Sequence, residues 1–166
     1  MDIFLSSLLV LFFTSLQLSV VSRIPLNHGM ADILLLFVIA WCLNRQARRY
    51  YIPVLLAGGL ISFISSLPFP TALISYLVAA FLTRALLSRL WEMPVFSMLL
   101  LTIVATFFQH LLYIVIMQFQ GVAIPLLSSL QEITLPSIFL NIIFALPMYL
   151  IVQDTQKFVY QEVEND

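Results

Sequence analysis

Residues able to do chemistry are few in this chain and widely spaced. His28 and Asp32 lie four positions apart, a spacing that would let both side chains share a metal ion or a proton on one helix face. The other histidine, His110, lies far along the sequence, and no HExxH, paired-glutamate or Ser/His/Asp motif accompanies it. We therefore expect Asp32 to cap or anchor the start of a helix. The sequence predicts a protein that is not an enzyme.

The sequence also offers few residues that could bind a metal ion or carry redox chemistry. Cys42 is the only cysteine, which excludes an intramolecular disulfide, CxxC redox chemistry and a thiolate metal cage, and we expect it to pack in the core. The eight acidic residues fall at segment ends, in links or in the tail, so a proton pathway through the apolar segments is not predicted. Arg89 and Glu92 are expected to anchor a helix end. We predict no cofactor.

The composition is typical of an integral membrane protein. Hydrophobic residues make up 62% of the chain and charged residues 9%, whereas soluble domains carry about a quarter charged residues. The net charge of −1 gives no reason to expect a nucleic-acid partner. Apolar runs of about 20 residues match the thickness of a bilayer core. The predicted fold is all-α, a compact bundle of about six transmembrane helices that forms a single domain.

Charges, prolines and polar clusters separate the expected helices. These cover residues 3–22, 31–44, 51–67, 71–88, 94–118 and 134–153, followed by a short acidic tail at about 154–166. The segment 31–44 is short for a crossing, so either it is tilted and shielded by its neighbours or residues 24–30 also enter the membrane.

Positive residues predict the orientation. Those in or beside the second and fourth links and after the last helix are Arg45, Arg48, Arg49, Arg84, Arg89 and Lys157. Only Arg23 lies on the other side. By the positive-inside rule, both termini and these links face the cytoplasm. On the outer side, the stretch from Gln118 to Thr134 carries no Lys or Arg, and its apolar part, Ile124 to Leu130, is expected on the membrane surface or against a partner.

Uncharged polar residues follow one face of several expected helices. They are Ser7, Thr14 and Gln17; Ser62 and Ser66; Ser75 and Thr83; Thr102, Thr106, Gln109 and Tyr113; and Ser137 and Asn141. Such stripes indicate helix–helix seams, and small residues such as Gly58 let helices approach closely. The alternative is that Gln17, Gln109, His110 and Asn141 line a small-molecule pocket near the outer leaflet, for a ligand that the residues do not identify.

From Ala31 onward, three segments match the pattern of one known family of membrane proteins. Ala31 to Leu36 is similar to the proline-aspartate-hydrophobic opening of that family's second helix, with alanine in place of proline. Gly58 to Pro68, followed by Ala72 to Leu77, is similar to its glycine-rich third helix, hairpin and leucine-tyrosine-rich fourth helix. Asn141 to Tyr149 is similar to the asparagine-to-proline stretch of its last helix. On these three segments, the chain resembles the MreD family of rod shape-determining membrane proteins.

The chain departs from the family pattern at two places. Many members carry an acidic residue where Ser62 stands, and a hairpin glycine where Phe69 and Pro70 stand. The positions that the resemblance marks as structural or interaction residues are Asp32, Gly58, Gly59, Tyr76, Asn141 and Pro147. Asn141 would bond across helices and Pro147 would kink the last helix.

The resemblance implies a non-enzymatic scaffold in the bacterial inner membrane. Such a subunit of the cell-elongation complex binds the single-span protein MreC and connects MreB filaments with wall synthesis by RodA and its transpeptidase partner. MreD proteins are also similar to the six-helix substrate-binding components of energy-coupling-factor vitamin transporters, which provides the rival hypothesis of solute binding. The first helix lacks an alanine-rich coupling triplet, and this favours the scaffold.

Overall fold

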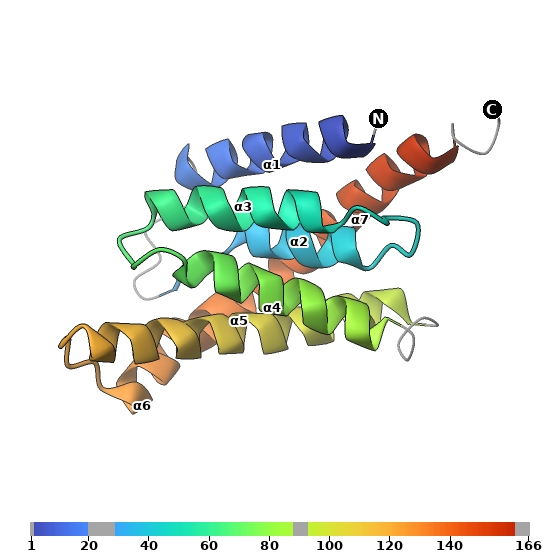
Figure 1. Ribbon diagram of the computed structural model, residues 1–166. Helices are drawn as coiled ribbons and strands as arrows, with labels where there is room; N and C mark the ends of the chain where they lie inside the picture. The colour runs from blue at the N-terminus through green and yellow to red at the C-terminus, as the bar shows by residue number, and fades with distance from the viewer. Residues whose placement is uncertain (1, 20–28, 88–92, 162–166) are drawn as a thin grey trace.

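Helices make up every regular element in the residues described by the computed structural model, which are 2–19, 29–87 and 93–161. The elements are α1 (Asp2–Ser19), α2 (Ile33–Cys42), α3 (Tyr51–Ile64), α4 (Thr71–Leu86), α5 (Pro94–Phe119), α6 (Leu126–Ser129), the π-helical turn η2 (Leu130–Thr134) and α7 (Leu135–Gln161). Figure 1 shows α1, α3, α4 and α5 side by side, with α2 behind α3 and with α7 crossing the back of the bundle.

As far as the described residues reach, the predicted boundaries hold within a few residues for the first five helices and for the start of the last one, but the last helix ends eight residues later than predicted, at Gln161 instead of residue 153. The stretch 126–134, which lay outside the expected helices, forms α6 and η2, so that helical structure runs from Leu126 through Gln161. Pro136 has no amide to donate to the carbonyl of Glu132, and the chain passes this point as a π-helical turn in which the Leu135 amide bonds to the Leu130 carbonyl. The first part of the predicted tail is therefore helical.

Helix α2 lies at the centre of the bundle. All 10 of its residues are buried, and it packs against α1, α3, α4, α5 and α7. At about 1.5 Å per residue it spans roughly 15 Å, about half of a bilayer core. Shielding by neighbours, one of the two explanations for its shortness, is observed. Residues 24–28, His28 among them, lie outside the described residues.

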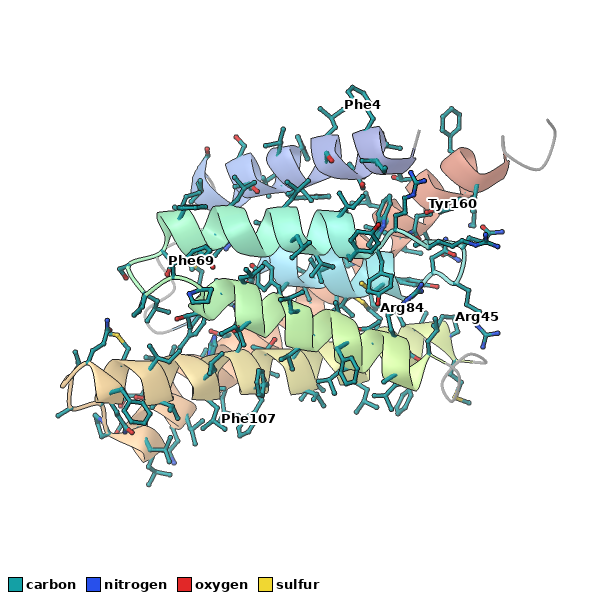
Figure 2. All side chains as sticks on the ribbon, in the orientation of Figure 1. Phe4, Arg45, Phe69, Arg84, Phe107 and Tyr160 are labelled. Atoms are coloured by element: carbon teal, nitrogen blue, oxygen red, sulfur yellow. The ribbon has the colours of Figure 1, made fainter. Side chains whose placement is uncertain are left out.

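The described bundle carries large apolar side chains on its outer surface as well as in its core. Figure 2 shows two of the outer ones, Phe4 and Phe107, directed away from the bundle. The predicted stripes face inward, since the buried polar residues include Thr14, Gln17, Ser62, Ser75, Thr83, Thr102, Thr106, Gln109, Ser137 and Asn141. Two helices, Pro94–Phe119 and Leu126–Phe158, are long and apolar enough to cross a membrane. The buried members of the stripes are seams between helices, as predicted, whereas Ser66 is exposed and Ser7 and Tyr113 are half-buried.

Helices α3 and α4 approach each other closely at Gly58. A Cβ on Gly58 would lie 2.9 Å from the Cα of Leu73 and 3.4 Å from the Cβ of Tyr76. One turn later, the Ser62 hydroxyl accepts a hydrogen bond from the Leu73 amide at 2.9 Å. Ser62 thereby satisfies one of the amides left unpaired at the start of α4.

We expect Gly58→Ala to lower the free energy of unfolding by about 1–3 kcal/mol, because the new methyl group meets the α4 backbone, which cannot move aside locally. Gly59→Ala is the matched control. A Cβ at Gly59 meets nothing within 4 Å, so this change should be neutral or stabilise by up to about 1 kcal/mol. Denaturant titration of the purified variants measures both. Equal stability of the two variants would contradict the packing described here.

Candidate functional site at the start of helix α2

The non-helical chain before α2 is held by an amide from α1. The Gln17 side chain donates from Nε2 to the Ala31 carbonyl at 2.8 Å and accepts at Oε1 from the Ile33 amide at 2.9 Å. Gln17 is buried, and its one carboxamide satisfies both a carbonyl and an amide that no helix would pair. Gln17 therefore holds the entry to α2 against α1.

Helix α7 holds the same segment from another side. The Ser137 hydroxyl accepts from the Met30 amide at 3.0 Å, and Asn141 Oδ1 accepts from the Asp32 amide at 2.8 Å. The other end of the Asn141 carboxamide donates to the Thr106 hydroxyl of α5 at 2.9 Å. Asn141 thus joins α2, α5 and α7, which is the cross-helix bonding expected of it.

The Asp32 carboxylate is the centre of the network. Its Oδ1 caps α2 by accepting from the Leu35 amide at 2.9 Å. The Tyr76 hydroxyl, fully buried on α4, lies 2.8 Å from Oδ1 and 3.0 Å from Oδ2. Gln109 Nε2, on α5, donates to Oδ2 at 2.8 Å and lies 3.0 Å from the Tyr113 hydroxyl. A negative group at a helix N-terminus is further favoured by the helix dipole.

This geometry favours a structural function for Asp32. Both carboxylate oxygens are engaged by donors from α2, α4 and α5, so they hold three elements in register. In the part of the chain that the structure describes, no three His, Cys, Asp or Glu residues are grouped so as to hold a metal ion. The proposed sharing of a metal or proton with His28 falls outside the described residues.

The opposite end of α2 is held by Arg84, which the sequence pattern marked only as an indicator of membrane orientation. Arg84, in the last turn of α4, donates to the carbonyls of Cys42 at 3.2 Å, Asn44 at 2.8 Å and Ala47 at 3.0 Å. Its guanidinium lies 4.3 Å from the centre of the Tyr50 ring. Figure 2 shows Arg84 at the end of the bundle that also carries Arg45. The positive charge matches the negative end of the α2 dipole.

A signal for this function was present in the sequence. Arg84 lies inside the apolar run of the fourth helix, whereas Arg45, Arg48 and Arg49 lie in a link. A charge within an apolar helix is costly unless it faces protein partners, so its position indicates an internal contact. Gln156 was also missed. Its Nε2 donates to the Trp41 carbonyl at 3.1 Å and adds α7 to this end of α2.

His110 lies beside a different feature, a cavity of about 290 Å³ at the α5–α6 end of the bundle. The ring Nδ1 lies 3.2 Å from the Thr134 hydroxyl, which also donates to the Ser129 carbonyl at 3.4 Å. Tyr113 lines the same cavity. Of the four residues predicted to line a solute pocket, only His110 lines this cavity. The side-chain amides of Gln17, Gln109 and Asn141 instead form hydrogen bonds at the start of α2.

The structure thus brings together most of the predicted site residues, but not all. Those that meet at the start of α2 are Gln17, Asp32, Tyr76, Gln109 and Asn141. Gly58 lies at the α3–α4 contact, Gly59 faces open space, and Pro147 lies inside α7.

No protein-family model, curated protein or solved structure matches this chain. The indications of function therefore come from its own sequence and geometry.

Proposed function

We propose that this chain is a membrane-embedded scaffold subunit, as the resemblance to MreD implies, and that it binds a single-span partner of the MreC type. Membrane insertion is supported by two helices of sufficient length and by an outer surface that carries many large apolar side chains, while uncharged polar side chains such as Gln17, Gln109 and Asn141 are buried. The start of α1 and the end of α7 lie at the same end of the bundle as the arginine-bearing link between α2 and α3 (Figure 1). This placement fits cytoplasmic termini under the positive-inside rule.

The observation that carries the scaffold proposal is the complete engagement of the Asp32 carboxylate. A general acid or base needs a position for the proton or substrate that it serves. Both carboxylate oxygens of Asp32 instead accept hydrogen bonds, from the Leu35 amide, the Tyr76 hydroxyl and the Gln109 side chain. A helix clamped at both ends gives a rigid body whose outer faces are left for lipid and for partner helices. In the proposed complex, those faces meet MreC, and the arginine-bearing end faces MreB, with RodA and its transpeptidase partner in the same assembly.

Affinity purification from native membranes after mild solubilisation tests this proposal. We expect a single-span protein with a large extracytoplasmic part to co-elute in a fixed ratio and to be identified by mass spectrometry. The purification is repeated with Gly58→Ala, whose disturbed packing of α3 on α4 should reduce recovery of the partner. Recovery of the free protein alone, from membranes that contain such a partner, would argue against a scaffold.

Solute binding, as in the vitamin-transporter components, is the second candidate, and the cavity beside His110 is the observation that favours it. Its walls combine apolar side chains with the polar groups of His110, Tyr113, Ser129 and Thr134, a mixture typical of small-molecule sites. The same purified protein should then contain a stoichiometric small molecule, lost in His110→Ala. A ligand-free preparation that still holds its protein partner would exclude this alternative.

A further inference from the structure

A second cavity lies at the end of the bundle opposite to His110. It measures about 430 Å³ and lies between the end of α2, the link that follows, α4, α5 and α7. We call it the basic cavity. Its hydrophilic side is formed by Asn44, Arg45, Gln46, Gln153, Gln156 and Lys157. Neither the Asp32 network nor the His110 cavity includes any of these residues.

The ionisable side chains among the described residues that line the basic cavity are basic. Arg45 and Lys157 line it, and no acidic residue is among the described residues that do so. Lys157 also lies 3.2 Å from Asp154, but this pair is 56% and 75% exposed, which makes it a weak surface contact that leaves ammonium hydrogens for another acceptor. Arg84, bonded to the Asn44 carbonyl at 2.8 Å, adds a third positive charge nearby. The cavity therefore favours an anion.

The rest of the lining is apolar. Leu43, Leu86, Leu87 and Leu101 form this side together with Pro94. Val95 and Phe96, which follow Pro94 in the chain, are 44% and 54% exposed, so the start of α5 also presents apolar side chains at the protein surface. A ligand that fits both sides has an anionic head and a long apolar part.

We infer that the basic cavity binds the headgroup of an anionic phospholipid, with the phosphate between Arg45 and Lys157 and an acyl chain along the leucines and α5. Basic pockets between helices at the cytoplasmic membrane surface are where anionic headgroups bind. An acidic peptide would also satisfy the cations, but it would leave the leucine wall uncovered. The inference rests on the membrane insertion proposed above, though not on the scaffold function.

Such a lipid would connect the link after α2 with α7, because Arg45 and Lys157 lie on these two elements. Binding only to the folded protein raises its stability by mass action. We therefore expect phosphatidylglycerol to raise the melting temperature of the purified full chain, and phosphatidylcholine, which carries no net charge, to have a much smaller effect.

The test uses the double variant Arg45→Gln with Lys157→Gln, reconstituted in nanodiscs and titrated with phosphatidylglycerol. Its affinity should fall by about tenfold or more, since each basic side chain near an anionic surface contributes about a factor of five. The control is Arg48→Gln with Arg49→Gln, which removes the same charge from the same link at two exposed positions outside the cavity lining. This control should lose clearly less affinity than the double variant, because its two arginines lie outside the cavity lining. The melting temperature without added lipid reports whether each variant folds, and the two single variants should each show an intermediate loss.

Three outcomes would overturn the inference. Equal stabilisation by phosphatidylcholine would show that charge is not recognised. Equal loss in the double variant and the control would place the effect on net charge rather than on the cavity. Full stabilisation by glycerol 3-phosphate, or by an acidic peptide, would show that no acyl chain is bound. A chain that fails to enter nanodiscs would instead overturn the proposed membrane insertion, and with it this inference, so the two failures are distinguishable.

Discussion

Asp32→Ala should lower the free energy of unfolding by about 3–5 kcal/mol, the largest loss that we expect from any single change in this chain. The change removes the N-terminal cap of α2 at Leu35, leaves the buried Tyr76 hydroxyl without its acceptor, and takes from the Gln109 amide one of two acceptors, the other being the Tyr113 hydroxyl. Unpaired buried polar groups cost about 1–3 kcal/mol each and a lost cap about 1 kcal/mol. Denaturant titration of the solubilised protein, followed by circular dichroism, measures the difference.

Asp32→Asn is the matched control for this prediction. It keeps one oxygen for the Leu35 amide but turns a donor toward the Gln109 side chain. Gln109 Oε1 is buried and has no hydrogen-bond partner in the described structure, so rotation of that carboxamide would supply an acceptor. We therefore expect a loss of only about 1 kcal/mol. If Asp32→Ala were as stable as Asp32→Asn, the carboxylate would not be the centre of the network.

Arg84→Ala should lower the free energy of unfolding by about 2–4 kcal/mol, because hydrogen bonds from a charged donor contribute about 1.5–3 kcal/mol each before the chain relaxes. Three carbonyls, of Cys42, Asn44 and Ala47, lose their donor, and the Tyr50 ring loses a cation. The turn after α2 should become accessible to protease before the rest of the bundle. Limited proteolysis and unfolding titrations measure the two effects.

Two variants, Arg84→Lys and Arg48→Ala, separate the effect of the Arg84 hydrogen bonds from the effect of positive charge alone. Lysine keeps the charge but not the planar fork that reaches several carbonyls at once, so we expect about half of the alanine effect. Arg48 is an exposed residue of the same link, and its removal should change the free energy of unfolding by less than about 0.5 kcal/mol. If Arg84→Ala were as mild as Arg48→Ala, then α2 would not depend on this clamp.

Helix positions followed from the sequence where apolar runs ended at prolines or arginines, as at Pro70, Pro94 and Arg45. The helical stretch before α7 was not predicted because Gln131 and Glu132 are polar. A helix can nevertheless continue through polar residues when no turn-forming residue interrupts it. The π-helical turn at Leu130–Thr134 depends on how α7 packs, and no local pattern encodes it.

The site was predictable in its residues but not in its connections. Polar spacing marked Gln17, Gln109 and Asn141 as facing the interior, and the resemblance marked Asp32 and Tyr76. Their convergence on the start of α2 joins positions more than 100 residues apart, such as Asp32 and Asn141, and helical periodicity carries no information on such pairings. The clamp by Arg84 was missed because its charge was used only for the orientation rule.

Cysteine labelling tests membrane crossing, the central claim, most directly. Cys42 is the only cysteine and is fully buried, so the unchanged protein provides the unlabelled background. New cysteines are introduced one at a time, as Val122→Cys between α5 and α6 and as Arg48→Cys between α2 and α3, at opposite ends of the bundle (Figure 1). A membrane-impermeant maleimide should label the Val122→Cys variant in intact spheroplasts, and the Arg48→Cys variant only after the membrane is opened. Equal labelling of both variants in intact spheroplasts would contradict a bundle that crosses the membrane.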